Sequence, residues 1–200
     1  MRVIPRLCAV LLLLPMLLSC GGQMLTNHAF FAMDTVITLR LPDGTDPSVL
    51  RGCEQLVYDT EQIFSATLAD SEVRRINASA GDISLSPEVL KVLRTALATA
   101  EATDGAFDPT VAPLTALWNI TAAEPVIPAD ADIRALLPVI GFRHLTLSGE
   151  VLSKDAPAAS LDLGGCAKGY ACQQAVEYLR ESGLATGLVS FGGNIGIVGP

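Results

Sequence analysis

The stretch LDLGGCAKGY, residues 161–170, constrains the possible fold more than any other part of the sequence. It predicts the apolar end of a strand with one carboxylate, Asp162, followed by two glycines and by Lys168 just inside a helix. This order places a turn of bare backbone against a helix N-terminus, where free amides and the helix dipole favour anions. We therefore expect a phosphate-bearing ligand here. The alternative is structural, with Asp162 capping the helix and Lys168 in solvent.

A second motif, DGAFDPT at residues 104–110, follows the predicted end of a helix. A helix stop accounts for part of it, because Gly105 suits the left-handed cap, Pro109 follows, and Asp108 can cap the next turn. That account does not require Phe107 between two carboxylates, so a functional role stays open beside the structural one. Together the two motifs predict a phosphate ligand with carboxylates nearby, an arrangement that usually includes a metal ion.

Composition and charge limit the classes of partner. The chain has 200 residues and is 50% hydrophobic, which is enough for one domain with a sizeable core. Its net charge of -8 argues against nucleic acid, because phosphate backbones require a basic surface. An aromatic content of 5% also disfavours a base-stacking platform. No CxxC pair is present among the five cysteines, so neither a disulfide framework nor a zinc site is predicted.

The N-terminus predicts a lipoprotein signal peptide over residues 1–19. A basic flank precedes an apolar run at residues 7–18, and small residues surround the expected cleavage site. The run is too short for a permanent membrane-spanning helix. Its end, LLSC, resembles the bacterial lipobox, in which the cysteine is diacylated and becomes the first mature residue. We expect lipidation of Cys20, with a single domain at residues 20–200 facing outward from the bacterial cell membrane. The alternative is an ordinary signal peptide that contains Cys20.

The rest of the sequence interleaves predicted helices and strands. The predicted elements are a strand at 30–41, helices that begin at Pro47 and Pro87, a short helical turn over 70–77, a short helix within 128–140, a hairpin around Ser148 and Gly149, a helix over 164–182 and a strand at 188–191. Because a hairpin accompanies the interleaved elements, we predict an α+β fold rather than a doubly wound parallel sheet. The given sequence stops at residues 196–200, where a predicted strand is ending. A strand that ends there would leave an unpaired edge in the sheet. We therefore expect a C-terminally truncated sequence.

Taken in order, the motifs resemble the ApbE family, the FAD:protein FMN transferases, which are commonly lipoproteins. The resemblance covers residues 30–200. The matching segments are MDT at 33–35 (usually MGT in the family), Ser65, DSE at 70–72 through Asn77, the motif at 104–110 with Pro113 and Trp118, the motif at 161–170, and Gly192 with Gly193.

The resemblance implies an α+β fold enclosing FAD, with Mg²⁺ on its pyrophosphate. Such an enzyme cleaves FAD and attaches FMN through its phosphate to a threonine or serine hydroxyl of an acceptor protein, leaving AMP. Carried over by motif, the implied FAD contacts are Met33, Thr67, Ala106, Phe107, Asp108, Asp162 and Lys168. Gly165 would offer its backbone carbonyl to the metal. At the position of Thr67 many members have an aromatic residue. No catalytic residue is assigned.

For this family the acceptor is typically a subunit of a membrane redox complex or a flavin-carrying reductase. The family continues beyond residue 200 into a segment with an aspartate and a threonine that complete the metal site, so the resemblance implies half of that site here. Two alternatives follow. One is an FAD pyrophosphatase, in which water replaces the acceptor hydroxyl, and the other is a non-catalytic flavin-binding lipoprotein.

Overall fold

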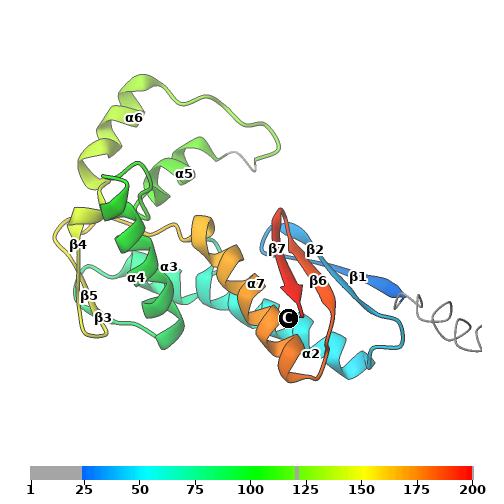
Figure 1. The fold of residues 1–200 in the computed structure, drawn as a ribbon. Coiled ribbons are helices and arrows are strands. Elements are labelled where there is room, and N and C mark those ends of the chain that lie inside the picture. Colours follow the sequence, from blue (N-terminus) through cyan, green and yellow to red (C-terminus); the bar gives the residue numbers. More distant parts are fainter. Residues whose placement is uncertain (1–23, 120–121, 200) are drawn as a thin grey trace, which may run out of the picture.

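The computed structural model describes residues 24–119 and 122–199 of the chain (Figure 1). The predicted signal peptide at residues 1–19 and the predicted lipidation at Cys20 lie outside the described residues. Within those residues, no helix has the length and apolar character that crossing a membrane requires.

A four-stranded antiparallel sheet forms one end of the molecule. Its strands are β1 (Leu25–Ala32), β2 (Thr35–Pro42), β6 (Gly187–Phe191) and β7 (Asn194–Val198), in the order β1-β2-β6-β7. The long helices α2 (Pro47–Phe64) and α7 (Gly164–Glu181) pack together against one face of this sheet (Figure 1). Alternate strand residues point into that layer and form much of the core, among them Ile37, Leu39, Val189 and Phe191.

The strand predicted at residues 30–41 is two strands, so that prediction is wrong in its extent. Met33 and Asp34 form a tight turn between β1 and β2, with φ of 52° and 56°. Two-residue hairpin turns of type I′ need positive φ at both central positions, and they are usually recognised by Asn-Gly or Asp-Gly pairs. The Met33 amide donates to Glu61 Oε1 at 2.9 Å. A contact from a distant helix therefore supports a turn that its own residue types do not indicate.

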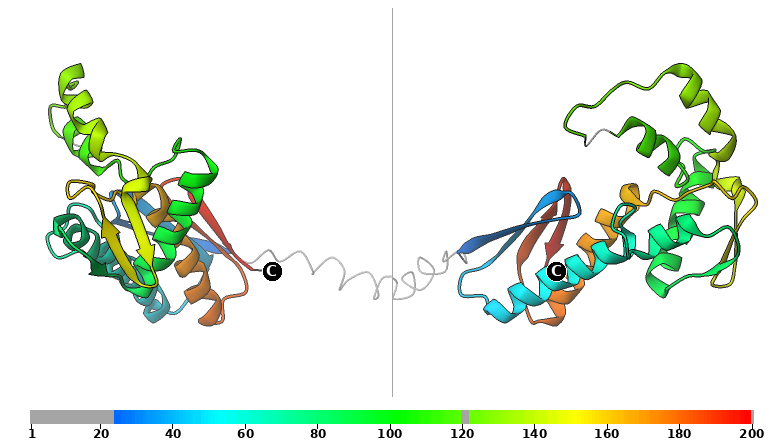
Figure 2. Two further views of the ribbon diagram at one scale, coloured as in Figure 1. Left: turned by 90° about the vertical axis from the view of Figure 1, so that its left-hand side faces the viewer. Right: turned by 180° about the vertical axis from the view of Figure 1, so that it is seen from behind.

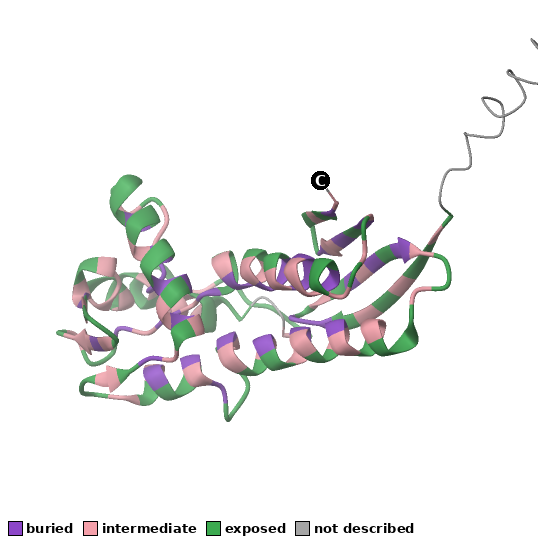
Figure 3. Cartoon of the chain, turned by 60° about the horizontal axis from the view of Figure 1, so that its bottom comes forward, coloured by how far each residue is buried: buried purple, intermediate pink, exposed green. Residues whose placement is uncertain are grey.

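The predicted helix starts are confirmed. Asp46 caps α2 by accepting from the Ser48 amide, and Pro47 occupies the first turn. Ser71 caps α3 (Glu72–Ala78), and Ser86 caps α4 (Pro87–Ala102), each accepting from an amide three residues on. Figure 3 shows the buried residues on the inner sides of the helices and in the strands between them. One apolar core joins these helices to the four-stranded sheet.

The second end of the molecule holds a smaller sheet and a helical arm. Strands β3 (Ile83–Ser84), β5 (Val151–Lys154) and β4 (Leu145–Ser148) pair in the order β3-β5-β4, which confirms the predicted hairpin. Helices α5 (Ala112–Trp118) and α6 (Asp130–Leu136) project from this end (Figure 2), followed by the 3-10 turns η1 (Leu137–Val139) and η2 (Phe142–His144). Neither α5 nor α6 has a buried residue. The predicted α+β class is confirmed, whereas α5 was not predicted.

Candidate functional site

A cleft of about 740 Å³ lies between the two ends of the molecule. It is bounded by the β1–β2 turn, the end of α2 with the loop after it, the inner side of α5, η1 and the start of α7. Binding sites for small ligands and cofactors usually have roughly 300–1,000 Å³. A smaller hollow of about 330 Å³ lies between residues 42–49 and 182–185, and it contains none of the predicted site residues.

Four of the predicted FAD contacts line this cleft, namely Met33, Thr67, Asp162 and Lys168. Met33 is buried at the β1–β2 turn, fixed there by its bond to Glu61. Thr67 lies on an exposed loop after α2, where its amide donates to Ser65 Oγ at 3.2 Å. Residues from opposite ends of the sequence thus face one cavity, as the predicted site requires.

Asp162 is both a cap and a residue of the cleft. Its Oδ1 accepts from the Gly164 amide at 2.9 Å, the bond that the structural alternative predicts. Its Oδ2 accepts from Thr115 Oγ1 on α5 at 2.9 Å. The Asp162 amide donates to Pro109 O at 2.8 Å. The carboxylate therefore joins the start of α7 to α5 within the lining of the cleft.

The charges of the cleft are unbalanced. Lys168 is its one cationic side chain, and it is half-buried on α7. Among the described residues it forms no ion pair. The carboxylates that line the cleft are Asp34, Glu61 and Asp162. Lys168 and the N-terminus of α7 supply the positive potential for an anion, and the carboxylates oppose it.

Gly165 and Phe107 come from the two sequence motifs and lie against each other. A Cβ atom added at Gly165 would stand 3.1 Å from Phe107 Cε2, closer than side chains normally approach. The aromatic ring thus packs on bare backbone in the first turn of α7. This contact explains why a glycine suits the position, and it brings the two motifs together as predicted. The role of the Gly165 carbonyl as a metal ligand stays a prediction.

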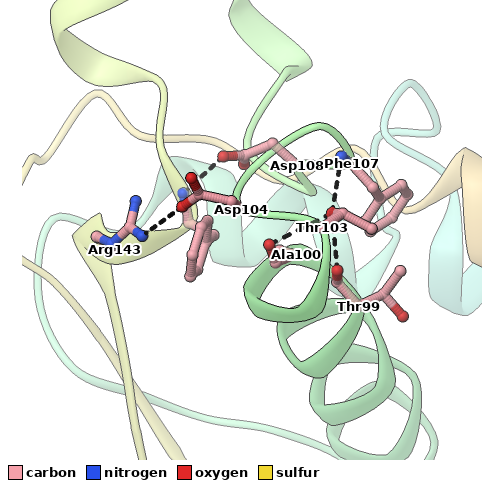
Figure 4. A network of polar contacts seen from close by, with 8 residues as sticks. Thr99, Ala100, Thr103, Asp104, Phe107, Asp108 and Arg143 are labelled. Carbon is pink, nitrogen blue, oxygen red and sulfur yellow. Dashed lines mark hydrogen bonds and ion pairs between the residues drawn. The ribbon is translucent and has the colours of Figure 1, made fainter.

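Ala106, Phe107 and Asp108 are not among the residues that line the cleft. One carboxylate oxygen of Asp108 is bonded within the loop that follows α4, and the other, whose bond is drawn in Figure 4, is bonded by η2. Oδ1 accepts from the Thr110 amide at 2.8 Å and from Thr110 Oγ1 at 2.6 Å. Oδ2 accepts from the Phe142 amide at 2.8 Å. These bonds fit the structural interpretation of Asp108, and the FAD contacts of this run stay predictions.

The same loop is held by two neighbouring contacts. Arg143 Nη2 lies 3.1 Å from Asp104 Oδ1, in an exposed ion pair (Figure 4). The Phe107 amide donates to Thr103 Oγ1 at 3.1 Å, which ties the loop back to the end of α4. The loop after α4 is therefore fixed on both sides, and it sets the position of the Phe107 ring beside α7.

Sequence reasoning assigned no role to three polar residues of the cleft. Glu61 holds the Met33 amide, and Thr115 donates to Asp162, but neither stands in a recognisable motif. Asn77 was noticed only as part of the family pattern. In the structure its side chain bonds to the backbone of Leu161, far away in the sequence. Nothing in the local sequence indicates any of these contacts.

A metal site made of protein side chains alone is not found in the described part of the chain. Within residues 24–119 and 122–199, no three His, Cys, Asp or Glu side chains gather as they would around a metal ion. Magnesium is usually held by one or two carboxylates together with phosphate oxygens of the ligand. The cleft, whose lining includes Asp162 and Gly164, fits that second kind of site. Gly165 is exposed but is not among the residues that line the cleft.

The fold and the cleft define an α+β protein in which a glycine-rich helix start faces a ligand-sized cavity. A family model described as the ApbE family matches residues 33–200. The chain belongs to the ApbE family, as its motifs predicted.

Similar proteins and solved structures are named as FAD:protein FMN transferases or as ApbE proteins. The FAD:protein FMN transferase of Vibrio cholerae is 33% identical over 150 residues, which are 73% of this chain and 45% of that protein. That of Klebsiella pneumoniae is 32% identical over 177 residues, 86% of this chain and 56% of that protein. The solved flavin transferase ApbE from Vibrio cholerae superposes with a TM-score of 0.80 at 30% identity, covering 87% of this chain and 59% of that chain. The solved ApbE protein from Thermotoga maritima also superposes with a TM-score of 0.80, at 28% identity. The match covers 88% of this chain and 59% of that chain.

These matches confirm the predicted family and fold. The chain spans about half the length of the curated relatives it matches.

Proposed function

We propose that this protein transfers FMN from FAD to a threonine or serine hydroxyl of an acceptor protein and releases AMP. The observation that carries the proposal is the cleft at the start of α7, where Asp162, bare backbone and Lys168 converge. The family membership supports it, as do relatives that are named FAD:protein FMN transferase.

The reaction balances without an oxidant or reductant. The acceptor oxygen forms a bond to the phosphorus of the FMN moiety, and the bond between that phosphorus and the bridging oxygen of the pyrophosphate breaks. The bridging oxygen leaves with AMP, and the hydroxyl proton is released. Transfer of this kind depends on positioned phosphate oxygens and on neutralisation of the charge on the leaving group. The N-terminus of α7 and Lys168 are the groups of this chain that suit the phosphates.

We include Mg²⁺ in the proposal because the charges of the cleft call for a cation. The cleft has more carboxylates than cationic side chains, and a pyrophosphate would add further negative charge. A divalent ion neutralises phosphate charge during transfer. Asp162 and the Gly165 carbonyl are the oxygen donors of this chain that would approach it, with the remaining ligands from phosphate and water.

We also propose that the protein acts at the outer side of the bacterial membrane, attached through a lipid on Cys20. The support is the lipobox-like end of the signal sequence. The acceptor would then be a protein exposed on the same side, such as a subunit of a membrane redox complex.

A single assay separates the proposal from its alternatives. The purified chain is incubated with FAD, Mg²⁺ and an acceptor that carries the target threonine. Covalent flavin on the acceptor is read by in-gel fluorescence, and the nucleotides are separated by chromatography. Flavin on the acceptor together with AMP supports the transferase. AMP and free FMN without labelled acceptor identify a pyrophosphatase. FAD binding without any product identifies a flavin-binding protein, and absence of FAD binding contradicts the proposed function.

A further inference from the structure

Asn77, at the end of α3, bonds to the main chain of Leu161 with both groups of its side-chain amide. Its Nδ2 donates to Leu161 O at 2.9 Å, and its Oδ1 accepts from the Leu161 amide at 2.7 Å. The Leu161 side chain is fully buried. Backbone groups in such a place need partners inside the protein, and here one asparagine satisfies both.

The segment that Asn77 holds carries the cleft carboxylate. Ser160 forms a parallel bridge with Val111, and the Asp162 amide donates to Pro109 O at 2.8 Å. Residues 160–162 are thus fixed on one side by residues 109–111 and on the other by Asn77. The second of these supports comes from a single side chain, which also lines the cleft itself.

The end of α3 is fixed in turn. Lys154 Nζ donates to Ile76 O at 3.2 Å and to Asn77 O at 3.4 Å. Burial lowers the pKa of Lys154, and among the described residues it forms no ion pair. Its partners are therefore the carbonyls at the end of α3, where a cation is favoured by the helix dipole. The main chain from which the Asn77 side chain projects is held in place.

We propose that Asn77 is a positioning residue of the flavin site. By holding Leu161 at its amide and its carbonyl, it sets where Asp162 and the start of α7 stand relative to the cleft. The inference rests on the proposed function, because the site it organises is the proposed FAD site. It assigns no chemical step to Asn77.

The test uses two variants of Asn77 and one matched control. Asn77→Ala removes both bonds. Asn77→Asp keeps the acceptor for the Leu161 amide and places a carboxylate oxygen against the Leu161 carbonyl. Ser86→Ala removes the cap of α4, which is a loss of stability away from the cleft. FAD affinity is measured by flavin fluorescence, and hydrogen exchange is measured on a peptide spanning residues 158–166.

We expect both Asn77 variants to raise the Kd for FAD by about tenfold or more, because the segment that carries Asp162 must then be ordered when FAD binds. Exchange of the Leu161 amide should quicken in Asn77→Ala. In Asn77→Asp the carboxylate faces the Leu161 carbonyl, which raises the pKa of the carboxyl group. Lowering the pH should therefore protonate this carboxyl group and restore a donor to Leu161 O. FAD affinity of this variant should then recover at low pH, relative to the wild type. Ser86→Ala should change neither the Kd nor the exchange of this peptide.

The outcomes separate this inference from the proposed function. If the wild type binds FAD and the Asn77 variants bind it equally well, Asn77 is not a positioning residue. An equal weakening in Ser86→Ala would also contradict the inference, because general loss of stability would then explain it. If the wild type does not bind FAD, the proposed function fails, and the positioning of a flavin site fails with it. Exchange of the Leu161 amide would then still show whether Asn77 holds this segment.

Discussion

Asp108 and Asp162 were both predicted to contact FAD, and replacing each by asparagine should give opposite results. In Asp108→Asn, one of the two side-chain positions becomes an NH₂ group. The side chain accepts from the Thr110 amide at one oxygen and from the Phe142 amide at the other. Either orientation of the new amide therefore points an NH₂ at a backbone N–H, so one donor loses its acceptor.

The cost of that loss can be worked from the geometry. A hydrogen bond to a charged acceptor contributes about 1.5–3 kcal/mol, and an unsatisfied buried donor costs on a similar scale. Asp108 is half-buried, so we expect a loss of about 2 kcal/mol in the free energy of unfolding. For a chain of this length that lowers Tm by about 4–8 °C.

Asp162→Asn should leave the fold nearly unchanged. Its Oδ1 can still accept from the Gly164 amide, and asparagine favours this kind of turn. The new NH₂ would face Thr115 Oγ1, which can accept it by turning its own proton toward Val111 O at 3.3 Å. We expect a change below about 0.5 kcal/mol in the absence of ligand. The stabilisation by FAD should fall, because a ligand stabilises only as far as it binds.

The assay is thermal melting of the wild type and both variants, each with and without FAD and Mg²⁺. A variant Asp108→Asn that melts like the wild type but loses its FAD shift would refute the structural interpretation of Asp108. Equal FAD shifts in Asp162→Asn and in the wild type would show that Asp162 is only a cap.

Three further results are expected. In a bacterium, the wild type should incorporate palmitate and Cys20→Ala should not; equal labelling would contradict the lipoprotein prediction. Gly196→Ala should lower the free energy of unfolding by about 1–3 kcal/mol, because its Cβ would stand 2.5 Å from Val176 Cγ2. Gly169→Ala should raise it by about 0.5–1 kcal/mol, because a Cβ there meets no atom within 4 Å and alanine favours a helix over glycine. Similar unfolding curves for these two variants would contradict the packing of β7 on α7. Burial raises the pKa of the Cys53 thiol from 9.0 to about 12, so the folded state favours the protonated thiol. The stability that this preference contributes is fully present below pH 9.0 and is lost as the pH rises from 9.0 to 12. Urea unfolding from pH 8 to 11 should show that the free energy of unfolding falls as the pH rises, and that it falls less steeply in Cys53→Ala than in the wild type. An equal fall in both proteins would show that Cys53 does not cause it.

The sequence predicted those elements whose signals are local. The caps at Asp46, Ser71 and Ser86 bond to amides two or three residues away, so their residue types and positions are enough to locate the helix starts. Helix α5 was missed because its N-cap position, Val111, makes no side-chain bond and the helix has only seven residues. Short helices depend on tertiary contacts more than on propensity. For α5, which has no buried residue, one such contact is the bond from Thr115 to Asp162.

The cleft could be predicted only in part, since its supports connect distant segments. The motif at residues 161–170 predicted that a helix begins beside Asp162 and contains Lys168, because these residues follow one another in the chain. The strand end and the glycine turn predicted there are wrong: residues 161–163 form no strand, and Gly164 and Gly165 already lie in α7. Glu61 with Met33, and Asn77 with Leu161, are pairs that only the folded chain brings together.

The same contacts show how the cleft keeps carboxylates beside a site for an anion. Glu61 accepts the Met33 amide and Asp162 accepts the Gly164 amide, so two of the three carboxylates already hold a backbone donor. The third, Asp34, is exposed at the β1–β2 turn, where solvent screens its charge. Of the three, Asp162 is the carboxylate beside the N-terminus of α7, where we propose that the phosphates bind, so its repulsion toward a bound pyrophosphate matters most. A cation between Asp162 and the phosphates would convert that repulsion into attraction.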